Sequence, residues 1–405
     1  MSARDATAPQ PGTRAPLAAR LVMRLLERLA HGTLEVALPD GVTRRFGHGA
    51  PSARIEVADW GLFSAVLRRG DTGFAERWMD GGWCTPDLPQ LLALCVANRD
   101  ALDRAIDGSF WGRVAGRLRQ LADANTRRGS RRNIAAHYDL GNDFYALWLD
   151  RSMTYSAARF DGDHSRTLEA AQACKLERVL ERLAPRPGAR VLEIGCGWGS
   201  FAELAARDFG CRVTALTLSR AQAEYASDRV RAAGLGDRVT VALRDYRDER
   251  ASYDHVVSIE MFEAVGERYW PAYFAAIARA LPPGGTAVVQ TITIADRLFE
   301  RYRSGTDFIR QYVFPGGMLP SPARFRAAAA AAGLEIRDEQ AFGADYAETL
   351  RRWRHAFLAE LPAVRALGCD ERFVRMWEFY LAYCQAAFAT QCTDVIQFEL
   401  SPRAR

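Results

Sequence analysis

We predict an α/β fold built on a doubly wound, mostly parallel sheet with helices on both faces, preceded by a small α+β domain. Two observations carry this prediction. From about Pro187 short β-rich runs alternate with helical segments, and the first of these runs leads into a glycine-rich turn. The chain has 405 residues, is 49% hydrophobic and 25% charged, and is therefore long enough for two or three domains and too apolar to be disordered as a whole.

The N-terminal third is predicted to form a separate domain. Residues 1–20 are rich in Ala, Pro, Arg and Thr without periodicity, which is typical of a disordered tail. In Leu21–Ala30 the apolar side chains share one helical stripe, which indicates a helix packed on its own domain or, alternatively, one lying at a membrane interface. Apolar runs between Gly32 and Asp71 predict several strands, and we assign residues 21–125 to this small, possibly lipid-binding domain.

Positive charge is concentrated in one band. The formal net charge is +5, and Ala101–Ala135 alone contains eight Arg and three Asp. The segment Arg113–Arg132 is either a solvated linker or a surface for anionic lipid headgroups, and it marks the domain boundary. No aromatic residues interleave with the arginines of Arg113–Arg132 and no base-flipping motif accompanies them, so we expect no nucleic-acid partner.

Cysteine usage and hydropathy suggest a compartment. The eight cysteines are scattered, with no CxxC pair and no His at zinc-ligand spacing, which favours a reducing environment and no structural metal. No run approaches the roughly 18 to 20 apolar residues that span a bilayer, and the first twenty residues lack the apolar core of a signal peptide. We expect a cytoplasmic protein.

Five β-rich runs define the main sheet, and each of the first four precedes a helical segment: ARVLEIG, CRVTALT, RVTVAL, YDHVVSI and TAVVQTITI. Such alternation predicts parallel strands with ligands bound at their carboxyl ends. The run VIQFEL near the C-terminus is predicted to be a last edge strand.

The sharpest local signal is VLEIGCGWGS, in which a buried strand enters a turn containing Gly195, Gly197 and Gly199 and then a helix. Glycines permit a tight turn and close approach to a ligand, and the helix start offers free N–H groups. Glu193 at the strand end suits an amino-acid-bearing nucleoside better than a pyrophosphate, so S-adenosylmethionine (SAM) is favoured over NAD. Thr217 stands where an acidic residue usually binds the ribose.

Seven motifs occur in the order of one family: HYDLGNDFY (His137–Tyr145), MTYSAARF (Met153–Phe160), LEIGCGWGS, TLSRAQ (Thr217–Gln222), MFEAVG (Met261–Gly266), FPGGMLPS (Phe314–Ser321) and FGADYAETL (Phe342–Leu350). From about Arg132 onward the chain resembles cyclopropane-fatty-acyl-phospholipid synthases and their mycolic-acid and fatty-acid methyltransferase relatives. The resemblance implies a seven-stranded, Rossmann-like, SAM-dependent methyltransferase domain over 126–405, with lid insertions at about 295–320 and 342–393.

The implied activity is transfer of a methylene or methyl group from SAM to the cis double bond of an unsaturated acyl chain in a membrane phospholipid. The resulting carbocation loses a proton to a bound bicarbonate and closes a cyclopropane ring. The alternative is a fatty-acid methyltransferase that gives a methyl- or methylene-branched chain without ring closure. A catalytically silent lipid-binding protein is disfavoured. The enzyme is expected at the inner face of the membrane, with a homodimer as one option.

The resemblance also implies site residues. Cofactor binding maps onto Tyr138, Tyr155, Ser156, Glu193, Gly195, Cys196, Gly197, Gly199, Thr217, Leu218, Gln222, Asp245 and Tyr246. Bicarbonate binding maps onto Glu263, Tyr346 and the Ile292 amide. Two positions depart from the family pattern: Ala157 keeps a backbone amide but lacks the frequent thiol, and Gln290 replaces a frequent His and cannot carry a proton.

Cys384 matches a cysteine suspected of catalysis in the family, although a cysteine on an aromatic helix face is more often inert packing.

Overall fold

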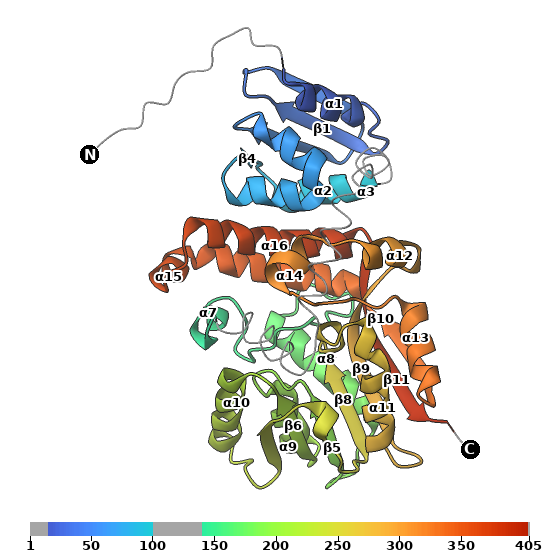
Figure 1. The fold of residues 1–405 in the computed structure, drawn as a ribbon. Coiled ribbons are helices and arrows are strands. Elements are labelled where there is room, and N and C mark those ends of the chain that lie inside the picture. Colours follow the sequence, from blue (N-terminus) through green and yellow to red (C-terminus); the bar gives the residue numbers. More distant parts are fainter. Residues whose placement is uncertain (1–14, 100–139, 404–405) are drawn as a thin grey trace. The chain divides into compact units, whose positions relative to one another are not determined.

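The computed structural model describes residues 15–99 and 140–403 (Figure 1). The chain divides into two compact units. The first contains the N-terminal part of the chain together with Gly368–Thr390, and the second runs up to Leu367 and resumes at Gln391. The predicted catalytic domain includes the whole of 342–393, whereas the structure groups Gly368–Thr390 with the N-terminal unit. The predicted boundary near residue 125 and the Arg-rich band lie outside the described residues.

The first unit holds a four-stranded sheet in the order β2-β1-β3-β4, with strands β1 (Gly32–Ala37), β2 (Thr43–His48), β3 (Ser52–Val57) and β4 (Trp83–Cys84). Its helices are α1 (Leu17–Leu26), α2 (Gly61–Met79), α3 (Leu88–Ala97) and α16 (Glu371–Ala389). Helix α16 packs against α2 and α3, and it buries an apolar face that includes Val374, Trp377 and Leu381. An α+β unit is thereby completed by a helix from far along the chain.

Helix α1 corrects the predicted extent of the N-terminal tail. The helix begins at Leu17, directly after Pro16, and ends at Leu26, so the predicted tail over 1–20 is too long. Proline fixes its own backbone at a value compatible with a helix start. Ala19 and Met23, four residues apart, are buried and anchor this first turn.

The second unit is the predicted α/β fold. Its seven-stranded sheet has the order β10-β11-β9-β8-β5-β6-β7. The strands are β5 (Arg190–Ile194), β6 (Arg212–Thr217), β7 (Val239–Leu243), β8 (His255–Ile259), β9 (Thr286–Ile294), β10 (Leu334–Ala341) and β11 (Thr393–Pro402). Strands β5 to β9 are parallel, and only β11 runs antiparallel to its neighbours β9 and β10.

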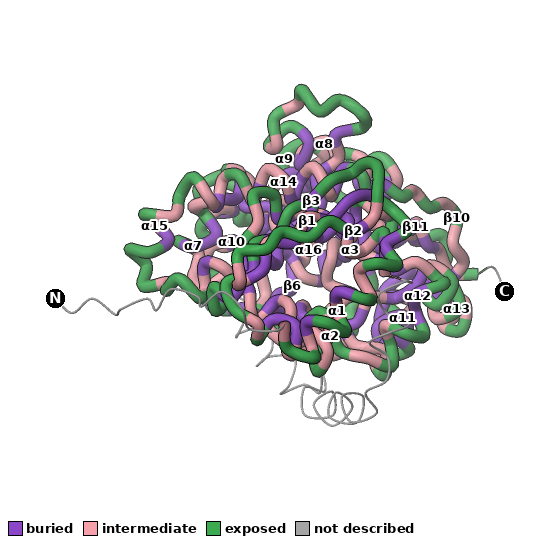
Figure 2. Tube along the Cα trace, turned by 90° about the horizontal axis from the view of Figure 1, so that it is seen from above, coloured by how far each residue is buried: buried purple, intermediate pink, exposed green. Residues whose placement is uncertain are grey.

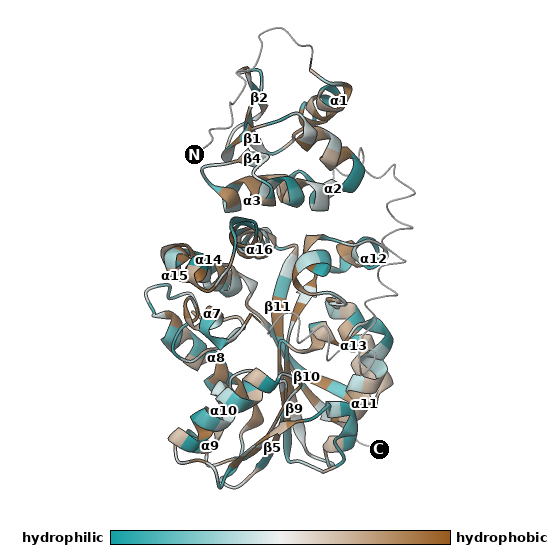
Figure 3. Cartoon of the chain, turned by 60° about the vertical axis from the view of Figure 1, so that its left-hand side comes forward, coloured by the Kyte–Doolittle hydropathy of each residue, from teal (hydrophilic) through white to brown (hydrophobic). Residues whose placement is uncertain are grey.

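Helices cover both faces of this sheet. One face carries α8 (Leu168–Leu183), α9 (Ser200–Asp208) and α10 (Arg220–Ala232), and the other carries α11 (Trp270–Ala280) and α13 (Pro322–Ala331) (Figures 1 and 3). The central strands are buried on both faces, as in β9, where seven of the nine residues are buried. Figure 2 shows that buried stretches lie mainly within helices and strands, while several loops are exposed.

Strand β11 contains the VIQFEL run, which we predicted to be an edge strand. It lies between β9 and β10, so β10 forms the edge instead. The sequence of β10 is LEIRDEQA, in which charged side chains hide the strand pattern but suit an edge that must avoid pairing with other chains.

The predicted lid segments are largely helical. The first contains α12 (Asp296–Ser304) and a π-helical turn over Ile309–Val313, and the second contains α14 (Gly343–Ala359), α15 (Leu361–Ala366) and α16. Among the described residues, no helix combines the length and apolar character needed to cross a bilayer.

Candidate active site

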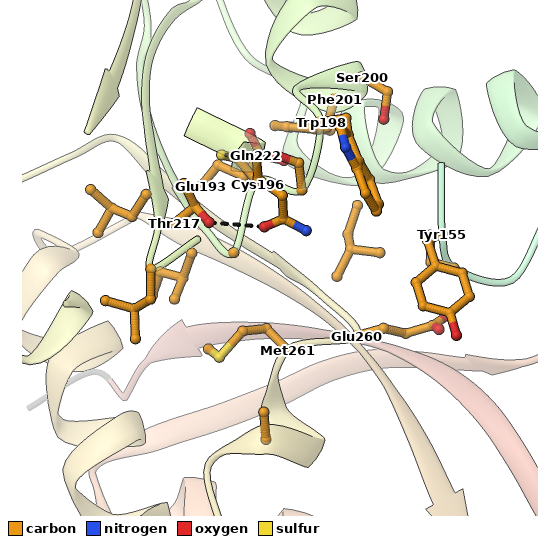
Figure 4. Close-up of a pocket in the computed structure, with 18 of the residues that line it drawn as sticks. Tyr155, Glu193, Cys196, Trp198, Ser200, Phe201, Thr217, Gln222, Glu260 and Met261 are labelled. Atoms are coloured by element: carbon orange, nitrogen blue, oxygen red, sulfur yellow. Dashed lines mark hydrogen bonds between the residues drawn. The ribbon is translucent and has the colours of Figure 1, made fainter. Parts of the chain in front are cut away.

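A pocket opens at the carboxyl ends of β5, β6 and β8, where a doubly wound sheet binds its ligands. Eleven residues predicted for the cofactor line it: Tyr155, Ser156, Glu193, Gly195, Cys196, Gly197, Thr217, Leu218, Gln222, Asp245 and Tyr246. Figure 4 shows Tyr155 and Glu260 at one end of the pocket and Thr217 at the other. Tyr138 lies outside the described residues.

The three glycines of the turn serve different purposes. Gly195 has φ +87°, and a Cβ there would lie 2.8 Å from the side chain of Met261. Gly199 has φ +86°, and a Cβ there would lie 3.0 Å from the Cβ of Ala226 on α10. Gly199 does not line the pocket. Its place in the motif comes from the close packing of α9 on α10, whereas Gly195 and Gly197 line the pocket.

Glu193 is one of the acidic residues that line the cofactor pocket. Its side chain is buried, and within the described residues its Oε2 atom has no hydrogen-bond partner. Burial raises the pKa of Glu193 to about 8, against the opposing charge of Lys175. An unpartnered buried carboxylate oxygen fits a cationic donor, and the ammonium group of SAM is one. The residues of this pocket therefore fit SAM.

Helix α8 holds the segment 154–157 in place, and the first three residues of this segment line the pocket. Gln172 donates through Nε2 to the carbonyl oxygens of Thr154 (3.1 Å) and Ser156 (2.8 Å). Lys175, the only lysine in the chain, is fully buried and donates through Nζ to Ser156 Oγ at 2.6 Å. Gln172 and Lys175 are three residues apart and thus share one helix face. The last residue of this segment is Ala157, whose backbone amide is used below.

Three of the predicted bicarbonate donors converge on the carboxylate of Glu260. Its Oε1 accepts from the Ala157 N–H (2.8 Å) and from Gln290 Nε2 (2.8 Å), and its Oε2 accepts from the Tyr346 hydroxyl (2.8 Å). A carboxylate of this chain thus uses the donors that a bicarbonate would need. The residues do not fit a bound bicarbonate, and this part of the prediction is corrected.

The backbone of Glu260 is unusual. Its φ is +49°, in the left-handed region that favours glycine. A glutamate is held there by the three hydrogen bonds to its side chain, and such strained residues cluster at functional sites. Burial raises the pKa of Glu260, while the charge of Lys175 and the three hydrogen bonds oppose this shift. A base with a pKa above the ordinary carboxyl value is suited to work near neutral pH.

Glu263 and Ile292 form a separate pair beside this site. Glu263 Oε1 accepts from the Ile292 N–H and from Thr291 Oγ1, the latter at 2.9 Å. Burial and the nearby charge of Glu260 raise the pKa of Glu263 to about 8. The predicted pairing of Glu263 with the Ile292 amide is present, but neither residue contacts Ala157, Gln290 or Tyr346 through a described hydrogen bond.

A row of aromatic rings begins at Tyr346, whose hydroxyl donates to the base. The Tyr346 ring centroid lies 6.1 Å from that of Trp353, which in turn lies 5.3 Å from Tyr155. Ring faces attract positive charge without offering a nucleophile. The arrangement therefore combines a fixed carboxylate with an aromatic wall, as a site that handles a cation requires.

Residues 125–398 match a family model described as mycolic acid cyclopropane synthetase. The chain belongs to this family. It is 40% identical over 401 residues to the tuberculostearic acid methyltransferase UfaA1 of Mycobacterium tuberculosis, covering 96% of this chain and 93% of that one. It is 36% identical over 358 residues to the cyclopropane-fatty-acyl-phospholipid synthase of Escherichia coli, covering 87% and 89%.

Solved structures agree. The mycolic acid cyclopropane synthase CmaA1, in complex with S-adenosylhomocysteine (SAH) and CTAB, aligns with a TM-score of 0.63 at 33% identity and covers 67% of this chain and 97% of that one. The cyclopropane synthase MmaA2 from Mycobacterium tuberculosis aligns with the same TM-score at 31% identity and the same coverage. The chain is thus a SAM-dependent methyltransferase of the cyclopropane synthase family.

Cys384 is not among the residues that line the described pocket. It is on α16, which packs in the first unit. Its role in catalysis stays a prediction.

Two residues of the site escaped the sequence analysis, Glu260 and Lys175. Glu260 directly follows β8, so its place at a strand end was readable, but its backbone conformation and partners were not. Lys175 stood out only as the single lysine.

Proposed function

We propose that this enzyme transfers the methyl group of SAM to the cis double bond of an unsaturated acyl chain in a membrane phospholipid, and that Glu260 removes the proton that completes the reaction. The observation that carries the proposal is the convergence of Ala157, Gln290 and Tyr346 on the Glu260 carboxylate. Three donors position a base before the substrate arrives.

The residues of the cofactor pocket divide the work. Glu193 would hold the ammonium group of SAM, and the turn at Gly195 and Gly197 would let the backbone approach it. When bound, SAM supplies an electrophilic methyl group on a sulfonium. The π electrons of the alkene form the new C–C bond, the C–S bond electrons stay on sulfur, and a carbocation remains on the acyl chain.

Glu260 then accepts the proton. The electrons of the broken C–H bond close either a ring or a new double bond, and the positive charge disappears. Until that moment the rings of Tyr346, Trp353 and Tyr155 stabilise the cation and exclude water, which would otherwise add to it.

Of the two products, we favour the methyl- or methylene-branched chain over the cyclopropane. Support comes from the 40% identity to a tuberculostearic acid methyltransferase over almost the whole chain. In addition, Ala157, Gln290 and Tyr346 donate to the Glu260 side chain, whereas the ring-closing mechanism expected from the sequence uses a free bicarbonate. Ring closure, the leading expectation from sequence, is the other outcome of the test.

The first unit is proposed to meet the membrane through α1. Leu17 and Leu21 are 65% and 42% exposed on this helix, and Arg20 and Arg24 are exposed beside them. Exposed apolar side chains next to cationic ones suit an anionic lipid surface.

The test is a product analysis. Purified enzyme is incubated with vesicles of unsaturated phospholipid and methyl-labelled SAM. The acyl chains are then released, and their masses are measured by mass spectrometry before and after mild hydrogenation. We expect a gain of one labelled carbon and a product that takes up two further hydrogen atoms, because loss of a proton from the branched cation leaves one double bond. A labelled product that resists hydrogenation indicates a cyclopropane ring.

The variant Glu260→Gln tests the base. Glutamine preserves the shape of the side chain but cannot accept the proton, so turnover should fall by about 10²- to 10⁴-fold. The Kd for SAH should stay within about threefold, since Glu260 is not assigned to cofactor binding. Turnover near the wild-type rate would show that another group is the base.

A further inference from the structure

A chain of side-chain amides leads from the surface to the Glu260 carboxylate. Gln290 on β9 and Gln397 on β11 are direct partners across the two antiparallel strands. Gln290 donates through Nε2 to Glu260 Oε1 (2.8 Å), and its Oε1 accepts from Gln397 Nε2 (3.0 Å). Gln397 Oε1 in turn accepts from Arg178 Nη1 on α8 (3.0 Å).

The two glutamines of this chain are buried, and the arginine at its outer end is partly exposed. Gln290 is fully buried, Gln397 is 2% exposed, and the Arg178 side chain is 12% exposed. Gln397 Nε2 also lies 3.5 Å from the carbonyl oxygen of Lys175. Since Gln397 Oε1 accepts from Arg178, both the nitrogen and the oxygen of its amide are hydrogen-bonded. Buried polar groups are kept in the interior only when they are hydrogen-bonded in this way.

The chain has a direction, and Arg178 sets it. A glutamine amide can donate at one end and accept at the other, so two stacked glutamines have two possible directions. A guanidinium can only donate, so Gln397 must turn its oxygen toward Arg178 and its NH₂ toward Gln290. Gln290 must then turn its own NH₂ toward Glu260.

The opposite direction is disfavoured at both ends. It would bring the NH₂ of Gln397 against the guanidinium of Arg178, and the carbonyl oxygen of Gln290 against the carboxylate of Glu260. The donor-only group at one end and the acceptor-only carboxylate at the other therefore agree on a single arrangement.

We propose that Arg178 and Gln397 are positioning residues for the reaction, which fix the direction of the Gln290 amide so that it donates to the base. The proposal rests on the proposed function of Glu260. It assigns a task to two residues that touch neither the cofactor pocket nor Glu260 through a described hydrogen bond.

Other charged groups also face these residues, and they stay in place in the tests below. Lys175 and Glu263 lie close enough to Glu260 to influence its charge, and Tyr346 is bonded to it. Arg178 faces Arg159, Arg182 and Asp338.

The decisive variant is Gln397→Glu. The new carboxylate can still accept from Arg178, but it has no N–H for Gln290. Gln290 is then drawn to turn its NH₂ toward the new carboxylate and its oxygen toward Glu260. A carbonyl oxygen beside the base disfavours its ionised form, so the acid limb of the kcat profile should move to higher pH by about one unit, which lowers kcat about tenfold at pH values on that limb. The Kd for SAH should not change.

A pair of variants at Arg178 makes the test independent of Gln397. Arg178→Met removes the donor that sets the direction and should give a smaller shift of the same sign, whereas Arg178→Lys keeps a donor-only group and should restore the wild-type profile. Arg182→Met is the matched control. Arg182 is one turn away on α8 and also pairs with Asp338, but it does not contact Gln397, so the profile should stay unchanged.

The outcomes separate the two proposals. If Glu260→Gln abolishes turnover but Gln397→Glu and Arg178→Met both leave the pH profile unchanged, the positioning proposal is wrong and the base assignment stands. If Gln397→Glu does not fold, as judged by loss of SAH binding, the Arg178 pair alone decides. If Glu260→Gln stays active, the base assignment is wrong and the positioning proposal falls with it.

Discussion

At the scale of single residues, the site differs from its expectation in the origin of its negative charge. The resemblance implied a free anion, and the structure places the Glu260 side chain among the donors meant for it. A tethered carboxylate is always present at full occupancy, and it requires a backbone with φ +49° at a non-glycine residue. Such strain is maintained only where the surrounding contacts enforce it.

This substitution of side chain for anion can be reversed experimentally. Glu260→Gly relieves the left-handed strain and leaves the Ala157, Gln290 and Tyr346 donors facing a space of carboxylate size. We expect turnover to fall by at least about 10²-fold in bicarbonate-free buffer and to recover in part with added bicarbonate or formate. Glu260→Gln is the control, because its side chain fills the space and should block recovery. Failure of every small carboxylate to restore Glu260→Gly would count against the base assignment.

Glu193 provides a second prediction at this scale. Because the pKa of Glu193 is raised to about 8, this carboxyl is largely protonated at neutral pH in the free enzyme. The ammonium of the cofactor needs the ionised form, so binding must release a proton. The Kd for SAH should therefore fall by about tenfold per pH unit between pH 6 and 8 and level off above pH 8.

The measurement is calorimetric titration of SAH in buffers of differing ionisation enthalpy, which also counts the released proton. Glu193→Gln should bind SAH more weakly at pH 8.5 and lose the pH dependence. Glu224→Gln, which changes an exposed carboxylate on α10, should keep it. A wild-type Kd that is flat between pH 6 and 8 would refute the role of Glu193.

At the scale of elements, α8 links the core of the sheet to the active site. Gln172, Lys175 and Arg178 follow one another at intervals of three residues; the first two bind Ser156, and the third binds Gln397, which is bonded to Gln290. The sequence LEAAQACKLERVLERL predicts an amphipathic helix, but buried polar side chains on its inner face run against that simple pattern. Such departures are expected at functional sites.

Helix α1 supports a prediction about lipid surfaces. Leu17→Glu with Leu21→Glu places two negative charges where apolar side chains are proposed to enter the lipid, so vesicle binding should weaken by about tenfold or more. Co-sedimentation with vesicles rich in anionic lipid measures this, and SAH binding should be unchanged. Val42→Glu, at a 48% exposed apolar residue elsewhere in the first unit, is the control. Equal co-sedimentation of all three proteins would exclude α1 as the membrane contact.

At the scale of the whole molecule, the two units are interleaved along the chain. Helix α16 belongs to the first unit although it follows most of the second. Trp78 on α2 donates through Nε1 to the carbonyl oxygen of Arg375 (2.9 Å), and the Arg375 guanidinium lies 5.2 Å from the Trp78 ring. Helix α16 is therefore part of the packing of the first unit.

Trp78 tests this arrangement. Trp78→Ala should lower the free energy of unfolding of the first unit by about 3 to 5 kcal/mol, because it removes a large buried ring and leaves the Arg375 carbonyl unpaired. Trp78→Phe keeps most of the packing and should cost about 1 kcal/mol. The measurement is calorimetry in the presence of SAH. SAH should stabilise the second unit, so that the lower stability of the first unit is seen as a separate transition. Loss of SAH binding in Trp78→Ala would show that the units do not unfold separately.

The alternation of strands and helices was enough to predict the class of the second unit, because parallel strands buried on both faces form continuous apolar runs. It did not reveal β10, whose charged residues suit an edge, nor the sharing of α16, which depends on contacts far apart in sequence. The glycine turn located the cofactor pocket. The identity of the base depended on the left-handed backbone of Glu260, and a sequence pattern does not predict the φ angle of a single glutamate.

The solitary lysine has a practical consequence. Lys175 is fully buried against Ser156, so amine-directed acylating reagents find no ε-amino group on the surface of the native protein. Acylation of Lys175 would then report opening of the pocket at a single natural residue. Comparing the acylation rate with and without SAH would show whether the bound ligand slows this opening.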